Sequence, residues 1–172
     1  MTEWNEVVRR HGACVWRTAW RLLGNHADVA DCFQSAFLDA FKFARRETVQ
    51  DWPALLRRLA TARALDCLRE RYRHRRWNEP LADPDCLVSP RSGPEQQAEV
   101  AELAERLRAA LAKLPPRQAE AMCLRWLDHL SNGEIGERLG LDLNAVGALL
   151  HRARQRLRQL LALDETKREP TQ

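Results

Sequence analysis

The chain has 172 residues and carries 28 basic and 24 acidic side chains, a formal net charge of +4. Its composition, 45% hydrophobic and 30% charged, is typical of a globular protein and not of a disordered one. No stretch approaches the roughly 18 consecutive apolar residues of a membrane helix, and the N-terminus lacks the pattern of a secretion signal. We therefore expect a cytoplasmic protein without membrane insertion.

Motifs for catalysis or cofactor binding are sparse. The five cysteines and five histidines are scattered, with no Cys-x-x-Cys pair, and no glycine-rich phosphate loop occurs. The sequence therefore predicts no cofactor, no metal and no enzymatic activity. One alternative stays open: Asp28, Asp31 and Asp39 share a predicted helix face and could hold a metal, or a cysteine could act as a nucleophile.

The charge is distributed unevenly. Residues 1–77 carry 15 basic and 9 acidic groups (net +6), residues 78–113 carry 4 and 7 (net −3), and residues 114–172 carry 9 and 8 (net +1). Residues 78–94 contain four of the eight prolines, which disfavour helix, and are predicted to be a linker. With no strand-like alternation elsewhere, we expect an all-α fold with two small helical domains, 1–77 and 95–172.

Three helices are predicted in the first domain. The first covers Trp4–Leu23 and ends at Gly24-Asn25. The second covers about 28–44, where Phe33, Phe37 and Phe41 form an apolar stripe. Its opposite face is polar apart from one leucine: Asp28, Asp31, Gln34, Ser35, Leu38 and Asp39. The third covers about 51–77, beginning apolar and ending basic.

The second domain begins with two amphipathic helices. Pro94 occupies the first position of one helix, and apolar residues recur along it at helical spacing: Val100, Leu103, Leu107 and Leu111. Pro115-Pro116 opens the next helix, for which we predict an inward face of Ala119, Met122, Cys123 and Trp126.

The strongest local signal is a helix-turn-helix over residues 131–158. Ser131 and Glu134 have the spacing of a capping box, Gly140 is placed to end the short helix, and Asp142 can cap the next one. No acidic residue occurs from Leu143 to Leu163. The outward face of the last helix carries Asn144, Gly147, Ala148, His151, Arg152, Arg154, Gln155 and Arg158. This pattern favours DNA contact, although an ordinary helical hairpin with a solvated arginine face has the same spacing.

A second basic cluster lies at the end of the first domain. Eight arginines occur between residues 57 and 76, opposed only by Asp66 and Glu70, and the aromatic residues Trp52, Tyr72 and Trp77 lie among and beside them. Arginine pairs with phosphate, and aromatic rings provide stacking surfaces for unpaired bases. The alternative is a solvated basic helix end that complements the helix dipole.

Nearly the whole chain resembles the extracytoplasmic-function (ECF) group of the sigma-70 family, the sigma factors of bacterial RNA polymerase. Residues 21–25 with 28–37 resemble the family's helix pair with its D-x-x-Q core, and residues 59–69 resemble its promoter-melting segment. Residues 114–118 and 130–154 resemble its C-terminal helix-turn-helix.

The resemblance implies a role for each of these surfaces. Asp31 and Gln34 match the motif that docks on the β′ coiled coil of core RNA polymerase, and the polymerase β flap is a further implied partner. Residues that match the −10 element site are Ala62, Arg63, Arg69, Arg73 and Arg76. Gly147, Ala148, His151 and Arg152 match positions that meet the −35 element, so promoter DNA is an implied partner. An anti-sigma factor is also implied, because the chain contains no sensory domain.

The chain departs from the family pattern at two places, Ala62 in the first domain and Gly147-Ala148 in the last helix. The family often has Asn at the position of Ala62, and Lys or Arg and Ser at the positions of Gly147 and Ala148. A methyl group cannot replace amide hydrogen bonds, so the −10 base preference stays open, and a helical glycine costs about 1 kcal/mol relative to alanine. Phosphate contacts and DNA shape are expected to contribute more at −35. The alternative function is a stand-alone helix-turn-helix regulator.

Overall fold

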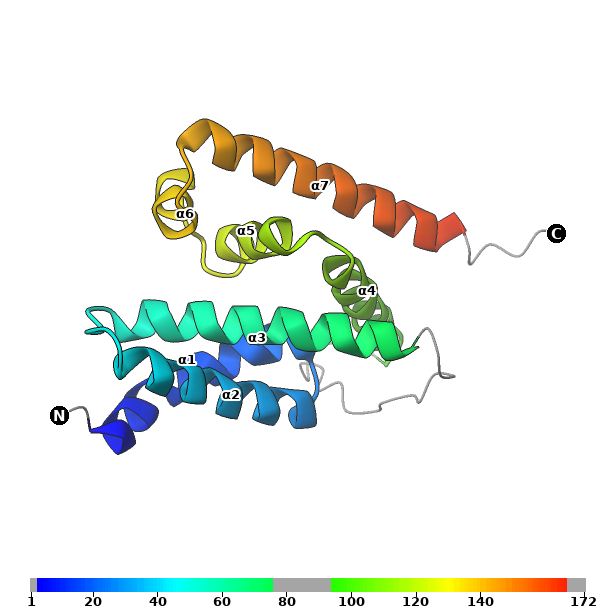
Figure 1. Ribbon diagram of the computed structural model, residues 1–172. Coiled ribbons are helices and arrows are strands. Elements are labelled where there is room, and N and C mark those ends of the chain that lie inside the picture. Colours follow the sequence, from blue (N-terminus) through cyan, green and yellow to red (C-terminus); the bar gives the residue numbers. More distant parts are fainter. Residues whose placement is uncertain (1–2, 76–93, 167–172) are drawn as a thin grey trace. The chain divides into compact units, whose positions relative to one another are not determined.

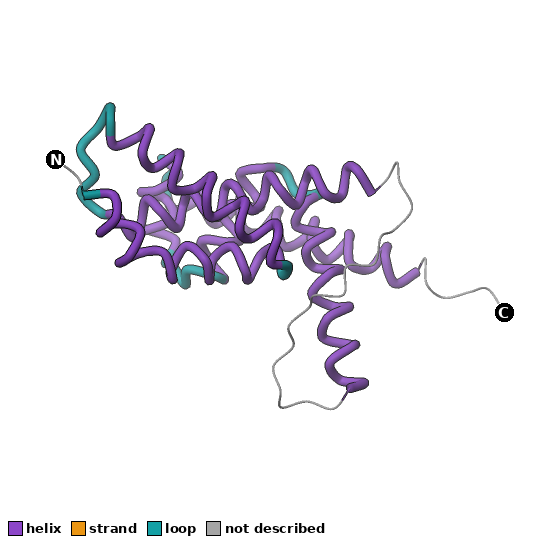
Figure 2. The backbone as a smooth tube through the Cα atoms, turned by 90° about the horizontal axis from the view of Figure 1, so that it is seen from below, coloured by secondary structure: helices purple, strands orange, loops and turns teal. Residues whose placement is uncertain are grey.

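The computed structural model describes residues 3–75 and 94–166. Within them, seven α-helices and no strands are present, which confirms the all-α prediction (Figures 1 and 2). The chain divides into two units, Met1–Val88 and Ser89–Gln172. The predicted linker, 78–94, lies outside the described residues except for Pro94, so its character and the exact domain boundaries stay predictions. No helix in the described part is both long and apolar enough to cross a membrane.

The first unit is a three-helix bundle of α1 (Trp4–Leu23), α2 (His26–Ala44) and α3 (Trp52–Arg75), each in contact with the other two (Figure 1). Small and branched side chains let the helices approach closely. The buried cluster contains Val7, Val15, Ala36, Phe37, Ala40, Leu56 and Ala60. At one end, Trp4 packs edge-on against Phe41 and Trp52, with ring centroids 5.0 and 5.4 Å away. Apolar burial of this kind is the main stabilising term of the bundle.

In the turn between α1 and α2, one residue ends the first helix and the next residue begins the second. Gly24 ends α1 in the left-handed conformation, with φ of 71°, and its N–H donates to the Trp20 carbonyl. Asn25 begins α2, because its side-chain oxygen accepts a hydrogen bond from the Asp28 N–H at 2.9 Å. Asn25 is therefore an N-cap and not part of the α1 ending, and α2 starts two residues earlier than predicted.

The second unit is built around its last helix. It contains α4 (Pro94–Ala112), α5 (Pro116–Trp126), α6 (Asn132–Leu139) and α7 (Leu143–Thr166), and the first three all contact α7. Its core includes Leu114, Leu124, Ile135, Val146, Leu150 and Ala153. The apolar residues that recur along α4 do not form a core stripe: Val100, Leu103 and Leu107 are exposed. Among the described side chains of α4, only that of Ala110 is buried.

Candidate nucleic-acid interface

The helix-turn-helix forms with the predicted caps. The Ser131 side chain accepts from the Glu134 N–H, and the Glu134 carboxylate accepts from the Ser131 N–H at 2.8 Å. Gly140 ends α6 with φ of 65°, and the Asp142 carboxylate accepts from the Ala145 N–H at 2.8 Å at the start of α7. These contacts fix both ends of the turn, so the orientation of α7 relative to α6 is well determined.

A close backbone approach inside this motif was not visible in the sequence. The Gly136 carbonyl accepts from the Leu141 N–H at 2.9 Å. A Cβ placed on Gly136 would lie 2.5 Å from the Leu141 carbonyl oxygen, closer than real Cβ contacts come. The turn after α6 can therefore fold back on the helix only because residue 136 has no side chain.

The capping box leads to a stability prediction. Ser131→Ala is expected to lower the free energy of unfolding of the second unit by about 1 kcal/mol, whereas Ser131→Thr, which keeps the hydroxyl group, costs much less. Hydrogen bonds from the Ser131 hydroxyl and N–H lower the pKa of the Glu134 carboxyl. The stabilisation that the Glu134 carboxylate gives to the capping box is therefore fully present above the ordinary carboxyl pKa. It is lost as the pH falls through the lowered pKa of Glu134. Urea unfolding followed by circular dichroism measures both effects; equal stability of the Ala and Thr variants would contradict the prediction.

The predicted DNA face of α7 is brought together on one side of the helix. Seven of its eight residues are exposed, and Gly147 is half-buried with open space around it. The buried side of the same helix is formed by Val146, Leu149, Leu150 and Ala153. The division between the two sides follows the 3.6-residue period, and the acid-free exposed side is suited to a DNA groove.

The prediction that Trp126 points inward was wrong. Trp126, the last residue of α5, is 45% exposed, and the Arg154 guanidinium of α7 lies 5.2 Å from its ring centroid. A guanidinium over an indole face is attracted by the ring's quadrupole. Arg154 therefore contacts α5 although it is exposed, as Arg152 and Arg158 are.

The basic segment of α3 separates into exposed and half-buried arginines. Ala62, Arg63 and Arg73 are exposed. Arg69 is half-buried and pairs with Asp66 at 2.8 Å, and Arg63 pairs with Asp39 of α2 at 2.5 Å. Arg76 lies outside the described residues. The predicted −10 residues Ala62, Arg69 and Arg73 share one face of α3, as their spacing of seven and four residues requires.

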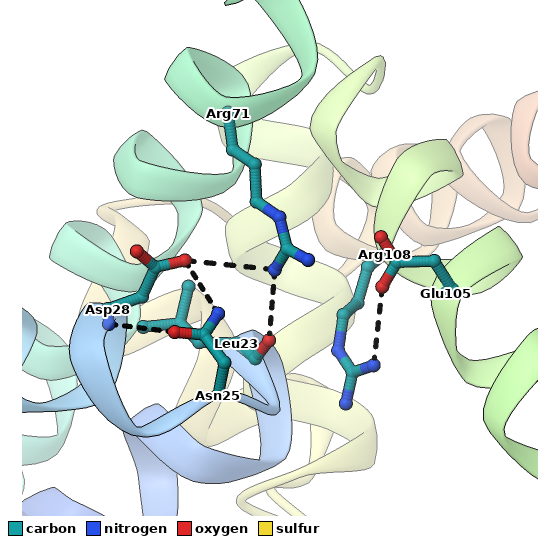
Figure 3. Close-up of polar contacts among 6 residues, drawn as sticks. All are labelled: Leu23, Asn25, Asp28, Arg71, Glu105 and Arg108. Carbon is teal, nitrogen blue, oxygen red and sulfur yellow. Dashed lines mark hydrogen bonds and ion pairs between the residues drawn. The ribbon is translucent and has the colours of Figure 1, made fainter. Parts of the chain in front are cut away.

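Arg71, a member of the same basic cluster, makes contacts within the three-helix bundle. Figure 3 shows it reaching from α3 to the turn between α1 and α2, where its Nη1 donates to the Leu23 carbonyl at 3.3 Å and lies 3.7 Å from the Asp28 carboxylate. The Asn25 amide also donates to Asp28, at 2.8 Å. Arg71 thus fastens α3 to the α1–α2 turn and satisfies a helix-terminal carbonyl.

A separate exposed face lies on α2. Asp31 and Gln34 are both exposed, one turn apart, as the sequence predicted. Leu38 and Phe41 continue this face and are also exposed, so the phenylalanine stripe turns outward at its end. The spacing puts Phe41 on the apolar stripe with Phe33 and Phe37, but Phe41 is 40% exposed. The Phe41 ring packs against the Trp4 ring and is also partly exposed to solvent. The Arg45 guanidinium carbon lies 6.0 Å from the centroid of the Phe41 ring.

Two of the three aspartates of the enzymatic alternative are engaged in ion pairs, and two of its cysteines are protonated. Asp28 and Asp39 lie in the ion pairs described above, and the described side chains contain no group of three His, Cys, Asp or Glu suited to a metal. The buried Cys32 thiol contacts the Ala60 carbonyl at 3.4 Å. Burial raises the pKa of Cys32 to about 12 and that of Cys67 to about 11, which disfavours the nucleophilic thiolate.

Known proteins resemble the chain over both units. The family described as Sigma-70, region 4 matches residues 104–157. The chain is 37% identical over 162 residues to the ECF RNA polymerase sigma factor SigE of Mycolicibacterium smegmatis, covering 94% of this chain but only 63% of that protein. It is 31% identical over 163 residues to the RNA polymerase sigma-E factor of Streptomyces coelicolor, covering 92% and 86%.

A solved structure shares the fold. The sigma factor RpoE of Bartonella quintana, crystallised with the anti-sigma factor NepR, matches with a TM-score of 0.53 and 18% identity, covering 95% of this chain and 99% of that one. The sequence matches include the bundle with Asp31 and Gln34 as well as the helix-turn-helix, whereas a stand-alone regulator would share only the second unit. The chain therefore belongs to the ECF group of the sigma-70 family of RNA polymerase sigma factors.

Proposed function

We propose that this chain binds core RNA polymerase and directs it to promoters, with residues 1–77 engaging polymerase and the −10 element and residues 95–172 engaging the −35 element. The observation that carries the proposal is the presence of three separate exposed surfaces: Asp31 and Gln34 on α2, the basic face of α3, and the acid-free face of α7. Sigma factors initiate transcription without catalysing bond formation themselves, and the proposed site of action is the cytoplasm.

On the polymerase side, Asp31 and Gln34 are the proposed contacts with the β′ coiled coil. The exposed Leu38 and Phe41 extend this face with apolar area. Interfaces commonly combine such an apolar centre with polar groups that fix the register. The β flap is the proposed partner of the second unit.

On the DNA side, Ala62, Arg63, Arg69, Arg73 and Arg76 are the proposed −10 contacts. The proposed −35 contacts are Asn144, Gly147, Ala148, His151, Arg152, Arg154, Gln155 and Arg158. We assign the arginines mainly to phosphate and the first turns of α7 to base edges, because helix N-termini enter the groove in helix-turn-helix proteins. Regulation by an anti-sigma factor is also proposed, by analogy with the Bartonella protein, which was crystallised with one.

Run-off transcription tests the function directly. Core polymerase from the source organism, supplied with the purified chain, should start transcripts at mapped promoters, and core polymerase without it should not. Failure on every mapped promoter would overturn the proposal. Co-purification of the chain from native cells tests its regulation: recovery of no partner except polymerase would contradict the anti-sigma assignment.

The −35 face has its own matched test. Arg158 and Arg156 are both exposed on α7, but residues two apart lie about 200° around a helix, so only Arg158 lies on the proposed face. Arg158→Ala should weaken binding of holoenzyme to a −35 duplex by about tenfold and reduce the salt dependence by about one ion. Arg156→Ala should change affinity by no more than about twofold. Equal losses in the two variants would contradict the assignment.

A further inference from the structure

One ion pair connects α2 to the exposed side of α3 immediately beside Ala62. The Arg63 Nε donates to the Asp39 Oδ2 at 2.5 Å, and the Arg63 Nη2 lies 2.5 Å from the same oxygen. The Lys42 Nζ lies 3.8 Å from the other carboxylate oxygen. Asp39 thus holds one edge of the guanidinium through two nitrogens, while Nη1 is not part of this pair.

The two partners differ in burial. The side chain of Asp39 is 19% exposed and that of Arg63 is 44% exposed. A carboxylate that is mostly removed from water depends on its partner, and losing that partner is strongly unfavourable. If a phosphate pulled Arg63 away, Asp39 would keep only the more distant Lys42, whose side chain is 71% exposed. A nucleic-acid phosphate is therefore expected to join the pair through the remaining N–H groups of Arg63 and not to break it.

We propose that Asp39 is a positioning residue for the −10 strand: it holds Arg63 in the orientation in which its remaining N–H groups bind a phosphate of single-stranded DNA. The inference rests on the proposed function, in which Arg63 contacts that strand. Asp39 itself does not touch the DNA. It acts from the helix that also presents Asp31 and Gln34 to polymerase.

Two opposing effects decide the sign of an Asp39 substitution. Removing a carboxylate several ångströms from a phosphate in water relieves repulsion worth about twofold in affinity at physiological salt. Releasing Arg63 requires its long side chain to be ordered again on binding, which weakens affinity by up to about tenfold. Positioning therefore predicts weaker binding although a negative charge has been removed, whereas simple competition for Arg63 predicts tighter binding.

The test uses holoenzyme assembled from core polymerase and each variant of the full chain, with a fluorescent single-stranded oligonucleotide carrying the −10 non-template sequence of a mapped promoter. Asp39→Ala should weaken binding about two- to fivefold and make the fall of log affinity with log salt less steep, by up to about 0.7. Asp39→Glu, which keeps the charge but moves the carboxylate, should weaken binding about two- to threefold. Unchanged or tighter binding by Asp39→Glu, or tighter binding by Asp39→Ala, would overturn the proposal.

Arg63→Ala separates this inference from the proposed function. It should weaken binding about tenfold, and the double variant Asp39→Ala/Arg63→Ala should bind no worse than Arg63→Ala alone, because Asp39 acts through Arg63. Wild-type binding by Arg63→Ala would remove Arg63 from the proposed −10 site, and the positioning role with it. Loss of binding by Arg63→Ala together with wild-type or tighter binding by Asp39→Ala would overturn positioning alone.

Glu70→Ala is the matched control. Glu70 lies 3.7 Å from His74 across one turn of α3, and its side chain is 65% exposed. Neither residue is among the proposed −10 contacts, so Glu70 positions none of them. Its removal should leave oligonucleotide binding unchanged or tighten it by about twofold. Melting temperatures measured in parallel show whether each variant is folded, and the Asp39→Glu result decides the question if Asp39→Ala does not fold.

Discussion

Asp31→Arg is expected to abolish promoter-directed transcription while leaving the chain folded and able to contact DNA. Asp31 is exposed on α2, where surface substitutions change stability by little. Reversing its charge at the centre of the proposed polymerase face converts an attractive contact into a like-charge one. Affinity for core polymerase should therefore fall by about a hundredfold or more. Fluorescence anisotropy of the labelled chain titrated with core polymerase measures this loss.

The matched control is Glu47→Arg. Glu47 follows α2, is also exposed, and undergoes the same change from negative to positive charge. Core affinity of Glu47→Arg should stay within about threefold of the original chain, since the change lies away from the Asp31–Gln34 face. Retention of core binding by Asp31→Arg would favour a regulator that acts without polymerase. Loss of binding in both variants would show that net charge, and not this face, governs the association.

Gly136→Ala is expected to destabilise the second unit by about 2–4 kcal/mol, because the new Cβ must displace the backbone of the helix-turn-helix at Leu141. A carbonyl oxygen of the main chain cannot rotate away as the end of a flexible side chain can. The shift would also move α7 relative to α6, so binding of a −35 duplex should fall by about tenfold or more. Differential scanning calorimetry and duplex binding by the full chain measure the two effects.

Gly133→Ala and Gly147→Ala are the stability controls within the same motif, and Gly133→Ala alone is the control for duplex binding, because Gly147 is a proposed −35 contact. A Cβ at Gly133 meets only the Ser131 Oγ at 3.9 Å, and one at Gly147 meets nothing within 4 Å. Both substitutions replace a helical glycine and should stabilise the unit, by up to about 1 kcal/mol. Equal behaviour of all three variants would mean that the close approach at Gly136 is not what limits the turn.

Local rules were sufficient to predict the all-helical class and the helix-turn-helix caps. Ser131, Gly140 and Asp142 each act on backbone groups within a few residues, so their spacing carries the information. Asn25 shows the limit of such rules, because an Asn beside a Gly can either end one helix or begin the next. The hydrogen bond that the Asn25 side chain accepts from the Asp28 N–H shows that Asn25 begins α2.

Contacts between distant residues could not be read from the sequence. Helical periodicity places Phe41 and Trp126 on inward stripes, but it does not tell how far the neighbouring helices extend over them. Arg71 and Arg63 read as members of one basic cluster, whereas each is bound to a residue more than twenty positions away. The importance of Gly136 could not be predicted, because it comes from the close approach of the Leu141 carbonyl, five residues later in the chain.

The protonated thiols in the first unit have a consequence for stress signalling. The thiolate is the form that attacks peroxide, and with pKa values of about 12 and 11 only a minute fraction of Cys32 and Cys67 is ionised near neutral pH. These two cysteines are therefore poor sites for sulfenic acid formation, even in a cell under oxidative attack. Any oxidative control of this sigma factor therefore has to enter elsewhere than through these two cysteines.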